Sequence, residues 1–122
     1  MGERADYEKL SKRLAGDNWR TPNTYCNLFM EPKLEPAVYM FIGFLDHPEQ
    51  DVVVSYVGMS EKLSQRLASH PALAEISKTF NYVQTWFKPT LVEYLREVEL
   101  SYIQEFDPPW NVQGRRRGVV SI

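Results

Sequence analysis

The sequence predicts an α+β domain in which a small three-stranded antiparallel sheet is flanked by helices. Three observations lead to this fold class. Two runs rich in β-branched and aromatic residues, 38–44 and 52–57, enclose a turn-forming segment, which predicts a β-hairpin. A third run, 80–87, alternates in polarity as a strand does. An apolar stripe with helical spacing then runs over 91–106.

The N-terminal third is expected to hold one short helix. Residues 5–15 can form it because Tyr7, Leu10 and Leu14 fall on one helical stripe. Residues 16–37 are rich in Gly, Asn and Pro, which predicts an irregular connection.

The hairpin brings two tyrosines together if its turn is centred near residues 47–48. Tyr39 is then opposite Tyr56, and Phe41 is opposite Val54. Because side chains alternate along a strand, both tyrosines project from the same face in this register. A slip of one residue would separate them.

A helix is expected after Ser60, which can act as its N-cap. Arg66 and His70 are four residues apart and therefore neighbours on one side of that helix. Pro71 limits it, and residues 72–78 can add another turn or two.

The last helix is predicted over 91–106. Thr90 and Glu93 have the spacing of a capping box at its start. Asp107, followed by two prolines, ends it.

One acidic residue lies on the apolar side of this last helix. On a helical wheel, Glu99 falls between Leu95 and Ile103, inside the arc of apolar side chains. That arc also contains Leu91, Val92, Val98, Tyr102 and Phe106. Burying a carboxylate is costly unless a cation or strong hydrogen bonds compensate it. Glu99 is therefore either paired with a Lys or Arg at the edge of the stripe or a ligand for a hard divalent cation.

Composition indicates one soluble, cytoplasmic domain. The chain has 122 residues, 43% hydrophobic and 25% charged, with a net charge of −2. No apolar run approaches the roughly 18 residues of a membrane span, and the charged N-terminus is unlike a signal peptide. The slightly acidic balance argues against a protein that coats nucleic acid non-specifically. Cys26, His47 and His70 are too few for a structural zinc site.

Ala37-Val-Tyr39, Tyr56-Val-Gly58 and the helix after them resemble the GIY-YIG nuclease family over about Pro36 to Asn111. Taken singly, each residue has a simpler explanation. The tyrosines are common sheet residues, Arg66 a solvated helix residue, and His70 a helix C-terminal cap. Ala37 replaces the glycine of the first family motif.

The spacing strengthens the resemblance. Arg66 lies ten residues after Tyr56 and His70 four further on, as in homing and restriction members of the family. Glu99 is followed twelve residues later by Asn111, after a turn that contains prolines, as in the family's closing helix and tail.

The resemblance implies a divalent-metal-dependent endonuclease that hydrolyses DNA. Glu99 would hold one Mg²⁺ or Mn²⁺, and Arg66 would bind phosphate oxygens. Tyr39 would act as general base or orient the attacking water, whereas Tyr56 and His70 would position the phosphate or the nucleophile; which of the three is the base stays open. Asn111 would brace the site or touch the backbone. The implied catalytic positions are Tyr39, Tyr56, Arg66, His70, Glu99 and Asn111.

The resemblance divides the chain into an extension (1–35), a nuclease domain (36–114) and a basic tail (115–122). Contacts to nucleic acid are expected from Arg66, His70, Lys62, Arg115, Arg116 and Arg117. The arginine run can equally be a disordered tail.

The partner is expected to be DNA, without a membrane role. The alternative is an inactive nucleic-acid-binding or partner-binding module that keeps the fold. A homodimer, or a targeting complex in which this chain is the catalytic module, is also open, as are the substrate form, sequence preference and pathway.

Overall fold

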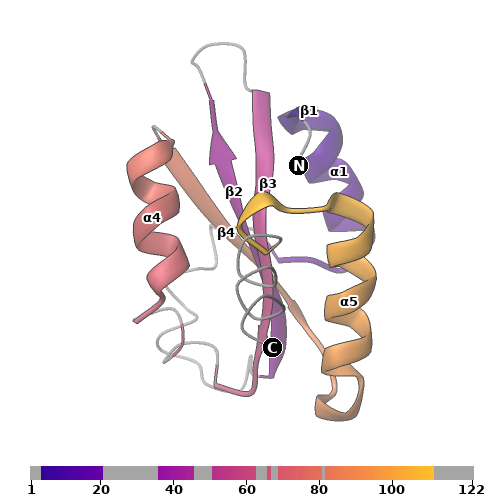
Figure 1. Ribbon diagram of the computed structural model, residues 1–122. Coiled ribbons are helices and arrows are strands. Elements are labelled where there is room, and N and C mark those ends of the chain that lie inside the picture. Colours follow the sequence, from indigo (N-terminus) through magenta and orange to yellow (C-terminus); the bar gives the residue numbers. More distant parts are fainter. Residues whose placement is uncertain are drawn as a thin grey trace.

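The computed structural model describes residues 4–20, 36–45, 51–62, 66, 69–80 and 82–111. They form an α+β fold with helices on both sides of one antiparallel sheet (Figure 1). Its elements in chain order are β1 (Arg4–Asp6), α1 (Tyr7–Gly16), β2 (Ala37–Phe44), β3 (Asp51–Ser60), α4 (Pro71–Thr79), β4 (Tyr82–Pro89), the 3-10 turn η3 (Val92–Tyr94) and α5 (Leu95–Phe106). The α+β class expected from the sequence is confirmed.

The sheet has four strands, in the order β1-β3-β2-β4, so the expectation of three strands is wrong. The additional strand, β1, pairs with β3 through only three residues, from Arg4 opposite Val53 to Asp6 opposite Asp51. A run this short carries no readable polarity period, and the edge of β3 supplies its pairing partner. The expected hairpin and third strand are present as β2, β3 and β4.

The helix expected over 5–15 is present as α1, with a clear local reason for its start. The Asp6 side chain accepts a hydrogen bond from the backbone N–H of Lys9 at 3.1 Å, as an N-cap does. Leu10 and Leu14 are buried on one side of α1. They belong to the same core cluster as the strands, so β1 and α1 are integral to the packing.

Each face of the sheet carries its own apolar cluster. Leu10, Leu14, Leu95 and Ile103 of α1 and α5 pack on the face from which Met40 projects. Ile76 of α4 packs on the opposite face, with Tyr39, Phe41 and Phe87. Figure 1 shows α4 on one side of the strands and α1 with α5 on the other.

From Ala37 to Phe41, the register of the hairpin differs from the expected one by two residues. Tyr39 is opposite Gly58, and Phe41 is opposite Tyr56. A shift of two preserves which face a side chain occupies, because the strand period is two. The two tyrosine rings therefore still share a face, with centroids 6.1 Å apart.

The start of the last helix also differs from the expectation. The Thr90 hydroxyl donates to the carbonyl of Lys88 at 2.8 Å instead of capping a helix, and η3 precedes α5. Leu91 and Val92, expected in the apolar arc, are therefore outside the α-helix and are 64% and 50% exposed. The helix ends as expected, at Asp107 in the left-handed conformation (φ 46°).

The helix expected after Ser60 falls largely outside the described residues, whereas the helical turns expected over 72–78 are present as α4. Within the described part, the backbone N–H of Lys62 donates to Ser60 Oγ at 3.0 Å, as expected of an N-cap. Among the described helices, none is long and apolar enough to cross a membrane.

Candidate active site

Three predicted site residues meet on the sheet face covered by α4. Tyr39 comes from β2, Tyr56 from β3, and His70 directly precedes α4. The Tyr39 hydroxyl is 2.7 Å from His70 Nε2. The rings of Tyr56 and His70 are nearly perpendicular, with centroids 5.0 Å apart. Residues from three separate segments thus form one contact group.

Arg66 adds a positive charge to this group. Its charge acts on both Tyr39 and Tyr56 and opposes part of the rise in the pKa of Tyr39, while Arg66 itself is exposed. An arginine beside two hydroxyls and open to solvent can bind a phosphate through its free N–H groups. Arg66 and His70 are four residues apart, and both interact with Tyr39.

His70 is enclosed by three aromatic rings. Those of Tyr39, Phe41 and Tyr56 surround it at centroid distances of 5.6, 5.0 and 5.0 Å. Burial, followed by the charge of Arg66, lowers the pKa of His70 to about 4. The histidine is therefore neutral at neutral pH. His70 occupies the N-cap position of α4 and makes no side-chain cap bond there. The helix that it was expected to cap at the C-terminus lies largely outside the described residues.

The bond between Tyr39 and His70 has a definite polarity. Burial and the charge of an ionised Tyr56 raise the pKa of Tyr39 well above its usual value, and Arg66 only partly opposes them. A protonated Tyr39 hydroxyl donates to an unprotonated Nε2, which leaves the His70 proton on Nδ1. Within the described residues, that buried Nδ1 has no hydrogen-bond partner.

Gly58 and Phe41 contribute to this site, although sequence reasoning assigned neither a functional role. A Cβ on Gly58 would lie 2.6 Å from the Tyr39 hydroxyl oxygen and 2.9 Å from the Tyr56 ring, so only glycine fits. Phe41 stacks on Tyr56 with centroids 5.8 Å apart. Two features of the sequence could have indicated these residues. Gly58 is the last residue of the Tyr56-Val-Gly58 motif, and Phe41 is two positions from Tyr39, so both side chains project from the same face of the strand.

Asn111 holds the strand that carries Tyr56. Its side-chain oxygen accepts from the Val57 backbone N–H at 2.6 Å, and its amide nitrogen donates to the Val57 carbonyl at 2.8 Å. The amide thereby satisfies the backbone of β3 as a neighbouring strand would. Asn111 is 8% exposed, and its side-chain amide bonds to the chain's own backbone at Val57.

Glu99 lies on another element. It is half-buried on α5, between the buried Leu95 and Ile103, as the helical wheel predicts. α5 packs on the sheet face opposite the one that carries Tyr39. The chain after α5 does reach β3, since Asn111 binds Val57 there.

The expected nucleic-acid contacts are only partly described. Lys62 is exposed just beyond the end of β3. Arg115, Arg116 and Arg117 lie outside the described residues. No cluster of three or more His, Cys, Asp or Glu side chains suited to a metal ion occurs in the described segments.

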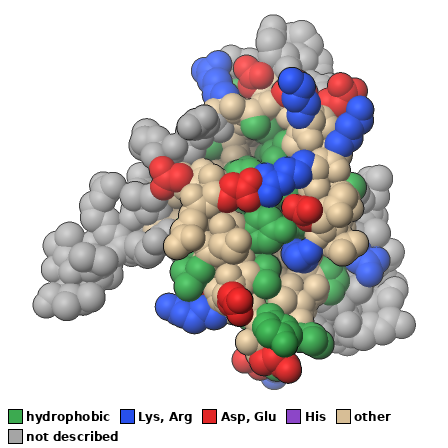
Figure 2. Space-filling view, turned by 90° about the vertical axis from the view of Figure 1, so that its right-hand side faces the viewer, with side chains coloured by type: hydrophobic (Ala, Val, Ile, Leu, Met, Phe, Trp, Pro, Cys, Tyr) green, Lys and Arg blue, Asp and Glu red, His purple; other side chains and the backbone are tan. Residues whose placement is uncertain are grey.

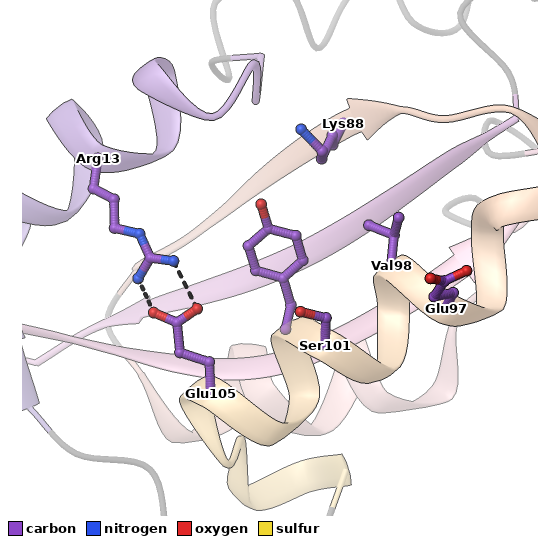
Figure 3. Close-up of a pocket in the computed structure, with 7 residues that line it drawn as sticks. Arg13, Lys88, Glu97, Val98, Ser101 and Glu105 are labelled. Carbon is purple, nitrogen blue, oxygen red and sulfur yellow. Dashed lines mark hydrogen bonds and ion pairs between the residues drawn. The ribbon is translucent and has the colours of Figure 1, made fainter.

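A groove of about 360 Å³ lies elsewhere, between α1, β4 and α5. Figure 3 shows Arg13 and Glu105 paired at one end, with Lys88 above and Glu97 and Ser101 on α5. None of the expected catalytic residues lines it. The groove and the tyrosine group are therefore separate features of the molecule.

Comparison with known proteins adds no relative: no family model, curated protein or solved structure matches the chain.

Proposed function

We propose that the chain is a divalent-metal-dependent endonuclease of the GIY-YIG type, which hydrolyses phosphodiester bonds in DNA. The observation that carries this proposal is the convergence of Tyr39, Tyr56, Arg66 and His70 from distant parts of the sequence. A histidine and a phenol that are buried beside a half-buried phenol and an exposed arginine are a costly group to keep for structural purposes alone.

The arginine would bind and neutralise the reacting phosphate. Arg66 reaches both phenols and remains open to solvent, so it can donate to non-bridging oxygens while held in place. The same charge would offset the negative charge that grows on the phosphate during attack. Tyr39, Tyr56 and His70 contact one another next to Arg66, and of these three Tyr56 is half-buried and the other two are buried.

The donor chemistry of the chain fits a single hard cation. Mg²⁺ commonly binds through one or two carboxylates and completes its octahedron with water and substrate phosphate. The half-buried carboxylate of Glu99 is such a donor. When bound, the ion would supply Lewis-acid stabilisation of the leaving oxygen.

Surface charge supports the α4 side as the nucleic-acid side. Figure 2 shows the face carrying α1 and α5, where acidic and basic side chains alternate around apolar ones. Such a mixed surface attracts a polyanion poorly. On the tyrosine side, the exposed Arg66 and Lys62 are cationic groups next to the candidate site.

A nuclease assay tests the proposal. Labelled single-stranded, duplex, nicked and branched DNAs are incubated with the full chain in Mg²⁺, Mn²⁺ or EDTA. We expect metal-dependent strand cleavage, and a loss of at least about 100-fold in the Glu99→Gln variant. DNA binding without cleavage in either metal would contradict the proposal and favour the inactive module.

Glu97→Gln is the matched control for Glu99→Gln. Glu97 lies on the same helix and lines the groove of Figure 3, on an exposed stripe. Its neutralisation changes the net charge equally and should leave cleavage within about twofold of wild type, because an exposed charge is screened by solvent. Equal losses in both variants would point to a global charge effect instead of a metal ligand.

A further inference from the structure

Phe41 lies among the residues of the candidate site, although its side chain carries no reactive atom. It is fully buried on β2, two residues after Tyr39 and therefore on the same face of the sheet. Its ring centroid is 5.5 Å from that of Tyr39, 5.8 Å from that of Tyr56 and 5.0 Å from that of His70. One apolar side chain thus touches three members of the site.

The bulge in β3 is the reason that Phe41 and Tyr56 stack. Continued regularly from Ile42 and Val54, the register would place Ser55 opposite Phe41. The extra residue of the bulge instead brings Tyr56 to that position. Side chains directly opposite each other on one face are the closest cross-strand neighbours. The two rings accordingly stack, with an interplanar angle of 23°.

The ring of Tyr56 is confined from a second side. A Cβ on Gly58 would lie 2.9 Å from this ring, so the backbone of β3 lies close against it. Tyr56 is only half-buried, and a half-buried side chain keeps one rotamer when packing restricts the others. Phe41 supplies that restriction on the inner side of the ring.

Phe41 also closes the surroundings of His70. Within the described residues, the groups that face the imidazole are the two phenols, the ring of Phe41 and the charge of Arg66. Of these groups, Phe41 alone has neither a charge nor a hydrogen-bonding atom in its side chain. Its contribution is therefore to exclude water, and burial is the main cause of the lowered pKa of His70.

The exclusion of water preserves the direction of one hydrogen bond. The Tyr39 hydroxyl is 2.7 Å from His70 Nε2 and donates to it when the histidine is neutral. An imidazolium would carry a proton on Nε2, so the hydroxyl would have to accept instead of donate. Water beside the imidazole would favour the imidazolium, because hydration stabilises the charged form.

We propose that Phe41 is a positioning residue of the site, whose ring holds the ring of Tyr56 in place and keeps water away from His70. Because it is fully buried, Phe41 acts through these two side chains and touches no substrate. The consequence for catalysis rests on the proposed function, whereas the effect on His70 does not depend on it.

The pKa of His70, measured by NMR of the ring protons, tests the effect of Phe41 without turnover. In wild type it is about 4. Phe41→Leu leaves space for water, so we expect the pKa of His70 to rise by about one unit toward 6.5. Circular dichroism at each pH establishes that the chain is folded. If Phe41→Leu does not fold, Phe41→Met preserves more of the side-chain volume and should show a shift in the same direction.

Phe87→Leu is the matched control. Phe87 is equally buried in the same cluster and lies on β4 opposite Tyr39. Within the part of the chain that the structure describes, it makes no ring contact with His70 or Tyr56. The variant loses the same volume from the same core, yet the pKa of His70 should stay where it is in wild type. Equal shifts in both variants would show a general loosening of the core and would overturn the proposal.

Cleavage kinetics test the consequence for catalysis. We expect Phe41→Leu to lower kcat for DNA cleavage by about 10-fold or more, because small displacements of reacting groups are costly. KM should stay within about twofold of wild type, since Arg66 is exposed and keeps its charge for the phosphate. Phe87→Leu should retain the kcat of wild type. A changed KM with an unchanged kcat would contradict a positioning role.

The outcomes separate this inference from the proposed function. If the full chain cuts no DNA in Mg²⁺ or Mn²⁺ but the pKa of His70 rises in Phe41→Leu alone, the nuclease is wrong and the effect of Phe41 on His70 stands. If the chain cuts DNA and Phe41→Leu changes neither that pKa nor kcat, the role of Phe41 is wrong and the nuclease remains.

Discussion

At the scale of single residues, the candidate site depends on two tight environments. His70 is neutral because aromatic rings and an arginine surround it, and Gly58 leaves the space that the Tyr39 hydroxyl occupies. Each environment has a direct energetic consequence. One is a dependence of stability on pH, and the other is an intolerance of any side chain at position 58.

The free energy of unfolding should fall as the pH is lowered from about 6.5 to about 4. The pKa of His70 is about 4 in the folded chain and near 6.5 in an unfolded one, so acid protonates the unfolded state first. The contribution is complete above pH 6.5 and is lost toward pH 4, by roughly 2 to 3 kcal/mol. Urea unfolding across this range measures it.

His70→Gln should remove this dependence, because the variant has no group at position 70 that titrates there. His47→Gln is the control, since position 47 holds the chain's other histidine. If the pH dependence survives in His70→Gln and disappears in His47→Gln, the environment described for His70 is wrong.

Gly58→Ala should destabilise the fold by about 1 to 3 kcal/mol, because the new methyl group must displace the Tyr39 ring or the strand. Cleavage should fall with it. Gly16→Ala is the control. Nothing lies within 4 Å of its Cβ position, and its φ is not positive. That variant should be neutral or more stable by up to about 1 kcal/mol. Thermal unfolding of both variants provides the comparison.

At the scale of elements, β3 carries two irregular features. The register of the hairpin shifts between Phe41 and Ile42, whose partners are Tyr56 and Val54, and Ser55 is the additional residue. Val54 and Val57 are three positions apart yet share one core cluster, which a regular strand forbids. The bulge lets β3 bury both valines while Tyr56 faces α4.

The second feature of β3 is the Asn111 clamp at Val57. Asn111→Ala leaves a backbone donor and acceptor of β3 without their partner, at a cost of about 1 to 3 kcal/mol. Amide hydrogen exchange at Val57 should become faster than in wild type. The same measurement on Gln104→Ala, which removes an exposed amide from α5, should show no change at Val57. Unchanged exchange in Asn111→Ala would contradict the clamp.

At the scale of the whole molecule, α1 and α5 are joined over the sheet by a paired Arg13 and Glu105 (Figure 3). Arg13 also lies 3.5 Å from Asp17 and over the ring of Phe106. The contact links residues 92 positions apart in sequence. Both side chains are about two-fifths exposed, so solvent weakens the pair.

Arg13→Gln should therefore lower the free energy of unfolding by only about 1 kcal/mol. A double-mutant cycle with Glu105→Gln should give a coupling of similar size that shrinks at high salt. Arg96→Gln, at an exposed position on α5, is the control and should change stability by less than about 0.5 kcal/mol. A coupling that is absent at low salt would contradict the bracing role of the pair.

The sequence by itself determined what depends on local periodicity. Strand alternation predicted the hairpin and placed both tyrosines on one face, and helical spacing predicted a half-buried Glu99. Side chains return to the same face every two residues in a strand and every 3.6 residues in a helix. These features can therefore be predicted from neighbouring residues, without knowledge of a distant partner.

Only the tertiary structure decided the features that need a distant partner. Four features depend on segments that are far apart in the chain: the pairing of β1, the bulge at Ser55, the bond between Asn111 and Val57, and the burial of Tyr39. Thr90 matches a capping box in sequence, yet its hydroxyl donates to Lys88 and its backbone N–H donates to the distant carbonyl of Pro36. Contacts across the fold compete with local preferences and override them wherever packing yields the larger gain.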